Sequence, residues 1–134
     1  MNNKKIIQFI PFSVWLIIIL CLSSFPGNQL PKVAVWQLDK LVHTLMYGIL
    51  SFLLFIPFYE QYLNNLKRLK LKVLIVLFGI SFGGIMEILQ ENIFINRSGN
   101  WIDFYANTVG AILGVLLAPI IIKFLRISRW LKIK

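Results

Sequence analysis

The third apolar run of the chain, residues 72–91, reads KVLIVLFGISFGGIMEILQE. A helix that crosses the ~30 Å hydrocarbon layer of a membrane needs roughly 20 predominantly apolar residues, and this run has that length. Comparable runs cover about residues 6–24, 39–58 and 101–124. In lipid the backbone has to satisfy its own hydrogen bonds, which favours helices for runs without β alternation. We therefore expect an all-α, polytopic membrane protein with four transmembrane helices.

The connections between the four runs are short, which predicts an antiparallel bundle that forms one domain over residues 1–134. The second connection, residues 60–71, spaces leucines three apart and places basic residues between them, namely Leu63, Leu66 and Leu69 with Lys67, Arg68 and Lys70. This pattern predicts either a short amphipathic helix on the membrane surface or a solvated polar loop.

The composition excludes most other classes of protein. Of 134 residues, 58% are hydrophobic and 14% are charged, whereas soluble domains are about 45–50% apolar and about 25% charged. The single cysteine, Cys21, excludes a disulfide scaffold, and no stretch outside the apolar runs could bury the core of a separate catalytic domain. The net charge of +9 comes from basic residues in short blocks between the apolar runs. This distribution indicates contact with membrane lipids and not with nucleic acid.

The basic residues also predict the orientation of the bundle. If the N-terminus, the second connection and the C-terminus share one side, that side carries all of the 14 Lys and Arg residues except Lys32, Lys40 and Arg97. Connections rich in Lys and Arg tend to remain in the cytoplasm. We therefore expect a multi-pass membrane protein with both termini on the cytoplasmic side.

With this orientation, the polar side chains of the spans gather at the outer end of the bundle. They come from the start of the second span, the end of the third span, the loop that follows it and the start of the fourth span. Residues three or four positions apart on these helices share one face. The candidate polar site consists of Asp39, Lys40, His43, Glu87, Gln90, Glu91, Arg97, Asp103 and Asn107.

Two of these carboxylates have a purely structural alternative. Asp39 and Asp103 lie at the predicted starts of the second and fourth helices. An N-cap carboxylate binds the free N–H groups of the first turn and lies at the favourable end of the helix dipole. Capping alone would therefore account for both aspartates.

The two glutamates at the end of the third span need a different explanation. Glu87 and Glu91 lie in the last turns of a helix, where the helix dipole disfavours negative charge. We therefore expect one of them to pair with Lys40, His43 or Arg97. Such a pair is either part of a functional site, because ionisable groups within spans are costly, or a salt-bridge clamp that holds the rim together.

Small residues follow one face of each of the last two spans. Gly79 and Gly83 precede Glu87 at intervals of four, and the fourth span carries Ala106, Gly110 and Gly114 at the same interval. Ridges of small residues let helix backbones approach closely. We expect the third and fourth helices to touch, which would bring Glu87 and Asn107 toward each other.

The residue types allow little established chemistry. No phosphate-binding loop, dinucleotide fingerprint or cysteine cluster is present. Metal-ligand types occur at His43, Glu87, Glu91 and Asp103, but their spacing indicates no metal site, and we expect no cofactor. Acid/base catalysis needs a His–carboxylate or carboxylate pair, and the sequence supplies the types without the geometry. Whether the protein is an enzyme therefore stays open, with binding favoured.

The order and spacing of the polar residues resemble the VanZ-like family of small bacterial membrane proteins. The resemblance extends from Asp39 to Gly114 and rests on Asp39-Lys40-x-x-His43, Glu87-x-x-Gln90 and Arg97-x5-Asp103-x3-Asn107-x2-Gly110-x3-Gly114. It implies an integral membrane protein with a role in resistance to the glycopeptide teicoplanin, and it implies no catalytic assignment. Glu91 lies outside this signature.

Together these observations predict an outward-facing polar site that binds a lipid-linked or lipophilic head group. A lipid-linked cell-wall precursor or a lipophilic glycopeptide would be the partner. The first alternative is a membrane enzyme that modifies such a head group by acid/base chemistry, with His43 and Glu87 as the pair. The second is a structural partner of a larger membrane complex.

Overall fold

The computed structural model describes residues 3–26 and 36–125, and these residues form helices joined by turns and loops. The elements are α1 (Asn3–Ser24), α2 (Trp36–Phe55), the 3-10 helix η2 (Ile56–Phe58), α3 (Tyr59–Leu63), α4 (Asn65–Asn92) and α5 (Trp101–Phe124). Four segments of the described chain are long and apolar enough to cross a membrane, namely Lys5–Ser24, Leu38–Leu63, Asn65–Asn92 and Trp101–Phe124. The predicted all-α protein with four candidate spans is confirmed.

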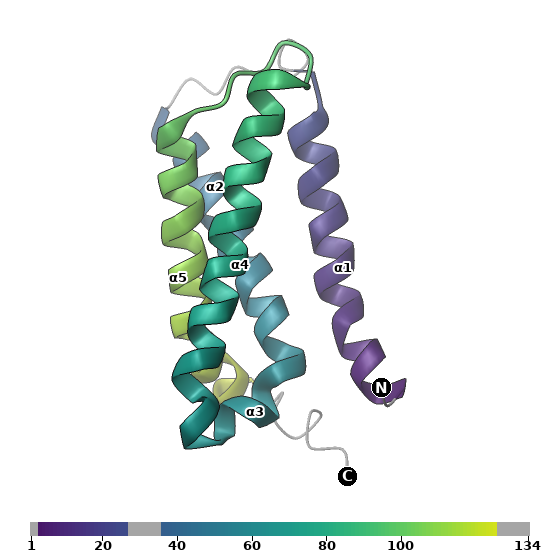
Figure 1. The fold of residues 1–134 in the computed structure, drawn as a ribbon, viewed down its shortest axis with the longest axis vertical. Helices are drawn as coiled ribbons and strands as arrows, with labels where there is room; N and C mark the ends of the chain where they lie inside the picture. The colour runs from purple at the N-terminus through teal and green to yellow at the C-terminus, as the bar shows by residue number, and fades with distance from the viewer. Residues whose placement is uncertain (1–2, 27–35, 126–134) are drawn as a thin grey trace.

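The long helices alternate in direction. α1 and α4 run one way and α2 and α5 the other, so the start of α1 and the end of α5 lie at the same end of the bundle (Figure 1). We call the end where α4 stops and α5 begins, at the top of Figure 1, the polar end, and the opposite end the apolar end. The basic residues Lys32, Arg126, Arg129, Lys132 and Lys134, used above for the orientation, lie outside the described residues.

The second connection differs from both predicted forms. The chain turns at Pro57 in η2 and continues into the short helix α3. Asn64 then starts α4, because its extended backbone and its side chain, which accepts a hydrogen bond from Leu66 N at 3.0 Å, form an N-cap. From there one helix runs to Asn92, so residues 65–71 are the first turns of the third span. The third span therefore begins seven residues before its predicted start at Lys72, and Leu66 stays 93% exposed.

α2 and α5 make the closest helix contact in the described part of the chain. A Cβ atom on Gly110 would lie 2.2 Å from the carbonyl oxygen of Thr44, and one on Gly114 would lie 2.2 Å from that of Gly48. The Thr44 hydroxyl also donates to the carbonyl oxygen of Ala106 at 3.3 Å. The ridge of small residues on α5 therefore faces α2. Only glycine allows this backbone-to-backbone approach.

The other ridge brings α4 against α5 at a different face. A Cβ atom on Gly79 would lie 2.7 Å from the Ala111 Cβ, and one on Gly83 would lie 3.2 Å from the Asn107 Cβ. This contact places the end of α4 beside the start of α5, so the predicted approach of Glu87 to Asn107 is confirmed. α5 thus packs against α2 and α4 at once, and it is the most buried of the four spans.

α1 lies at the outside of the bundle (Figure 1). Only 11% of its apolar window is buried, compared with 39% for α5. Its Trp15 indole N–H donates to the carbonyl oxygen of Met46 on α2 at 2.9 Å. α2, α4 and α5 therefore form the unit that holds the polar residues, and α1 covers one side of it.

At the apolar end the same three helices are joined by hydrophobic packing. One cluster of buried side chains comes from the end of α2, from α3, from the start of α4 and from the end of α5, namely Phe55, Tyr59, Leu71, Ile75, Val115, Ala118 and Ile122. These residues are at most 9% exposed. Hydrophobic packing between these side chains therefore holds the apolar end together.

Candidate functional site

The polar residues singled out in the sequence gather at the polar end, where three helices and one loop meet. α2 supplies Asp39, Lys40 and His43; α4 supplies Glu87, Gln90 and Glu91; the loop supplies Arg97; α5 supplies Asp103 and Asn107. Their mutual contacts divide them into an ion-paired group, a hydrogen-bonded relay and a loop clamp.

The ion-paired group joins α2 to α5. The Lys40 Nζ donates to Asp39 Oδ2 at 2.7 Å and to Asp103 Oδ1 of the neighbouring helix. The side chains of Lys40 and Asp103 are only 14% and 12% exposed, so this interhelical pair is largely shielded from solvent. Neither aspartate is the predicted N-cap, because α2 begins at Trp36 and the side chain of Asn100 caps α5. The salt-bridge clamp exists, but aspartates and not glutamates form it.

The relay runs across all three helices. The imidazole Nδ1 of His43 lies 3.0 Å from Asn107 Oδ1, and Asn107 Nδ2 donates to Glu87 Oε1 at 3.2 Å. Asn107 is 1% exposed and Glu87 is 9% exposed. At its outer end, His43 Nε2 lies 3.9 Å from Asp39 Oδ1. The buried amide of Asn107 thus connects the histidine of α2 with the carboxylate of α4.

The loop clamp explains why two glutamates end a helix. Glu87 Oε2 accepts a hydrogen bond from the Asn100 backbone N–H at 2.9 Å, and Glu91 Oε2 accepts one from the Gly99 N–H at 2.7 Å. A Cβ atom on Gly99 would lie 2.6 Å from the Glu87 carbonyl oxygen, so the loop can approach α4 only with glycine there. The expected pairing of these glutamates with a cation is corrected, because backbone N–H groups supply the compensation for the unfavourable dipole.

Arg97 does not join this group of acids. Its Nε donates to the Phe25 carbonyl oxygen at 3.1 Å and its Nη2 donates to the Leu22 carbonyl oxygen at 3.1 Å. A cation at the carboxyl end of α1 neutralises carbonyl groups that have no intrahelical partner. Arg97 therefore ties the loop to α1.

Gln90 is 5% exposed and lies one turn beyond Glu87 on α4.

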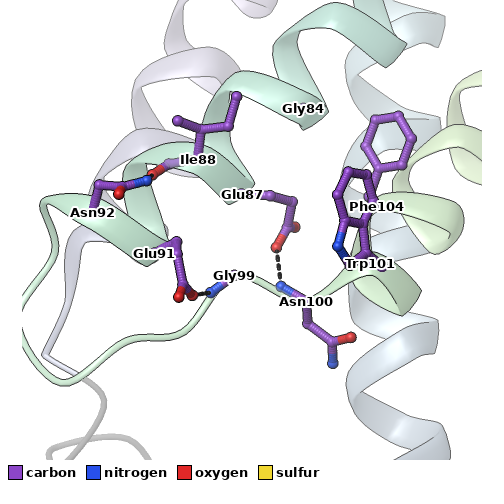
Figure 2. A pocket seen from close by; sticks show the side chains of 9 residues that line it. All are labelled: Gly84, Glu87, Ile88, Glu91, Asn92, Gly99, Asn100, Trp101 and Phe104. Carbon is purple, nitrogen blue, oxygen red and sulfur yellow. Dashed lines mark hydrogen bonds between the residues drawn. The ribbon is translucent and has the colours of Figure 1, made fainter.

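A pocket of about 420 Å³ opens between the end of α4 and the start of α5 (Figure 2). Figure 2 shows Glu87 between Glu91 of α4 and the rings of Trp101 and Phe104 of α5, with its carboxylate directed to Asn100. The lining consists of Gly84, Glu87, Ile88, Glu91, Asn92, Gly99, Asn100, Trp101 and Phe104. Glu87 therefore belongs both to the relay and to the wall of a cavity that could hold a small polar group.

A second grouping has the ligand types of a metal site. Ligand atoms of Asp39, His43 and Asp103 lie within 4.8 Å of one another. This set differs from the one considered in the sequence, because Glu87 and Glu91 bind the loop instead. The ammonium group of Lys40 already binds both aspartates, so a metal ion would have to displace that contact. The donor set as arranged fits a lysine better than a divalent cation.

Sequence reasoning missed the residues that form the front of the pocket. Trp101 and Phe104 were predicted only as part of the fourth span, and Gly99 and Asn100 only as part of the third loop. One signal was present, since an asparagine directly before an apolar run is typical of an N-cap, and Asn100 Oδ1 does accept from Ile102 N at 2.9 Å. This signal predicts that the loop ends at Asn100, but it does not predict a cavity.

The family profile described as VanZ/LLP1 matches residues 2–123 of the chain. The chain belongs to this family. The match includes every polar residue discussed above and most of the described bundle. In comparisons with curated proteins and with solved structures, no match to this VanZ/LLP1 chain is found. The family profile is thus the basis for the VanZ/LLP1 membership. The fold is the basis for the four helices that could span a membrane.

Proposed function

We propose that the chain binds the polar head group of a lipid-linked or lipophilic molecule at its polar end. The observation that carries this proposal is the pocket between α4 and α5, whose wall includes the nearly buried carboxylate of Glu87. Ionisable groups at this depth are costly, and binding sites are a common reason for their presence. A cavity of about 420 Å³ is within the usual size for a small-molecule site.

Preorganisation supports a binding role. Asn107 and the Asn100 N–H together hold both oxygens of the Glu87 carboxylate, so its direction is set before any ligand arrives. Rigid polar groups lose little conformational entropy when a ligand binds. The pocket also borders exposed apolar side chains, since Ile88 and Trp101 are 63% and 77% exposed. A ligand with a polar head and an apolar tail matches both features.

The proposed location is the outer face of a bacterial cytoplasmic membrane, with both termini in the cytoplasm. The charge bias of the connections supports it. Single cysteines at Ser98 and Asn65, in a Cys21→Ser background, test it in intact cells with a membrane-impermeant maleimide. Labelling at Ser98 alone is expected, and labelling at Asn65 alone would reverse the orientation.

The physiological consequence we propose is a change in susceptibility to teicoplanin. The test is expression of the chain in a susceptible bacterium and measurement of the inhibitory concentration. Glu87→Gln should abolish protection while the amount of protein in the membrane is unchanged. Loss of the protein from the membrane would instead mark Glu87 as a structural residue. If cells with and without the unsubstituted chain are equally susceptible to teicoplanin, the proposed role in teicoplanin resistance is wrong.

Acid/base catalysis is a second candidate, favoured by the direction of the relay. A carboxylate can only accept hydrogen bonds, so Asn107 turns its NH₂ to Glu87 and its oxygen to His43. That oxygen requires a proton on His43 Nδ1, so Nε2, which lies 3.9 Å from Asp39 Oδ1, is the ring nitrogen that would act as the base. Asn107 stands between His43 and the pocket wall, however, so binding explains the pocket more directly.

Turnover distinguishes the two candidates. Purified protein would be incubated with a bacterial lipid extract, and head-group changes would be followed by mass spectrometry. Catalysis predicts a product that disappears in His43→Ala and also in Asn107→Ala. Binding alone predicts an unchanged extract. If the chain neither binds nor modifies a lipid, and its variants fail to accumulate in the membrane, it would be a structural partner of a larger complex.

A further inference from the structure

The pocket between α4 and α5 carries negative charge in a strongly basic protein. Its lining includes the carboxylates of Glu87 and Glu91 and no basic side chain, although the whole chain has a net charge of +9. The groups that bind these carboxylates are backbone N–H groups and the Asn107 amide. Such dipoles orient a carboxylate but leave its formal charge in place. A positively charged ligand would be attracted to this wall.

Among the described residues, the Lys and Arg side chains of the polar end are engaged elsewhere. Lys40 binds the two aspartates of the ion-paired group, and Arg97 binds the carbonyl oxygens of Leu22 and Phe25. Neither belongs to the lining of the pocket. A positively charged ligand in the pocket could therefore neutralise the carboxylates of Glu87 and Glu91.

The opposite wall of the pocket is aromatic. The rings of Trp101 and Phe104 lie edge to face, with centroids 6.1 Å apart, and stand across the pocket from Glu91 (Figure 2). The face of an aromatic ring attracts cations, most strongly for indole, and such rings recognise substituted ammonium groups. A phosphate or sulfate would be repelled by the carboxylates.

We propose that the pocket takes an ammonium head group, with its apolar tail along the exposed side chains of Ile88 and Trp101. This inference rests on the proposed function, because it names the chemistry of the head group that the pocket would bind. The ammonium lies between the Glu91 carboxylate and the Trp101 ring. In a zwitterionic amphiphile, the accompanying anionic group stays outside the pocket.

Three probes with the same tail test the inference on the unsubstituted full chain. The purified protein in uncharged dodecyl maltoside micelles is titrated with dodecyltrimethylammonium, with dodecanol and with dodecyl sulfate. The readout is tryptophan fluorescence, and Trp101→Phe identifies the part that comes from the pocket. We expect saturable binding of the cation only, at concentrations where the neutral and anionic probes give no pocket signal.

A charge-removing variant locates the effect. Glu91→Gln keeps an oxygen for the Gly99 N–H and should weaken binding of the cationic probe by roughly tenfold, as expected for one partly exposed ion contact of ~1.4 kcal/mol. Glu60→Gln is the matched control, since Glu60 is exposed on α3 at the apolar end, and it should change nothing. Equal effects of both substitutions would overturn the inference.

The outcomes separate this inference from the proposed function. If dodecanol or dodecyl sulfate binds at the pocket as tightly as the cation, and Glu91→Gln is without effect, the head-group site stands and the ammonium class is wrong. If none of the three probes alters the signal of Trp101, both proposals fail.

Discussion

The two ends of the bundle are built from the same three helices but held together by different forces. At the apolar end, side chains such as Phe55, Ile75 and Ile122 pack in a buried hydrophobic cluster. At the polar end, Lys40, Asp103 and Asn107 connect the helices through charges and hydrogen bonds, and most of these groups are shielded from solvent.

The difference teaches that stability alone does not explain the polar end. Buried ion pairs and amides are often no more stabilising than well-packed apolar side chains, and the apolar end shows that this sequence can join α2, α4 and α5 without them. A polar network beside a pocket is therefore better explained by what it positions.

The largest effect is expected from breaking the ion pair between α2 and α5. Lys40→Met leaves Asp103 without its cation at 12% exposure and should lower the free energy of unfolding by about 3 kcal/mol, near the lower end for a broken buried pair. Thermal unfolding in detergent measures it. The double variant Lys40→Met with Asp103→Asn should recover most of the loss, and a single variant as stable as the unsubstituted chain would contradict a buried pair.

The next effect comes from the backbone contact of α2 and α5. Gly110→Ala places a methyl group 2.2 Å from the Thr44 carbonyl oxygen, which is a backbone atom and cannot turn aside. The helices must separate, at a cost of about 2–3 kcal/mol for overpacking. Gly84→Ala is the control, because its Cβ would lie 3.4 Å from the Phe104 ring, an ordinary contact. Both variants are compared by their melting temperatures, and equal values would show that α2 and α5 are less close than described.

The relay should affect stability modestly and binding strongly. Asn107→Ala leaves Glu87 and His43 without their shared partner, which should lower stability by about 1–3 kcal/mol. It should also weaken binding of dodecyltrimethylammonium, because the Glu87 carboxylate is no longer held at the pocket wall.

Phe55→Ala provides the comparison at the apolar end. It should also lower stability, by less than the ~3–5 kcal/mol seen in water-soluble cores, because lipid is as apolar as the site that Phe55 leaves. Its binding of the same probe should stay unchanged. If Phe55→Ala weakens binding as much as Asn107→Ala does, the two ends are not functionally distinct.

The smallest effect is expected where the loop meets α1. Arg97→Ala removes two hydrogen bonds to the carbonyl oxygens of Leu22 and Phe25, worth about 1 kcal/mol together at this partly exposed position. Hydrogen exchange should increase for the amides at the carboxyl end of α1 and remain unchanged in α5. Increased exchange throughout the bundle would mean that α1 supports the whole fold.

The sequence predicted the helices better than the contacts between them. Four spans followed from run length and hydropathy, and the early start of α4 was missed only because the basic residues 67–72 made its first turns resemble a separate surface segment. The N-cap that Asn64 provides is the local signal that would have corrected it.

The site was predicted as a set of residues but not as a network. Glu87 and Glu91 were expected to need partners, which follows from their place in the last turns of α4. That these partners are the N–H groups of Gly99 and Asn100 depends on how the loop folds back, and backbone donors leave no trace in the amino-acid pattern. Arg97 had the right charge for these glutamates but binds the end of α1.

The amino-acid order alone determined the membrane class, the number of candidate spans and the clustering of polar residues at one end, because hydropathy and helical period are properties of short stretches of chain. Only the tertiary structure decided that α5 turns Gly110 and Gly114 toward α2 and that Asn107 also contacts His43. The rotation of each helix about its axis depends on which neighbours it can approach closely. That choice creates the relay and the pocket, and no single segment contains it.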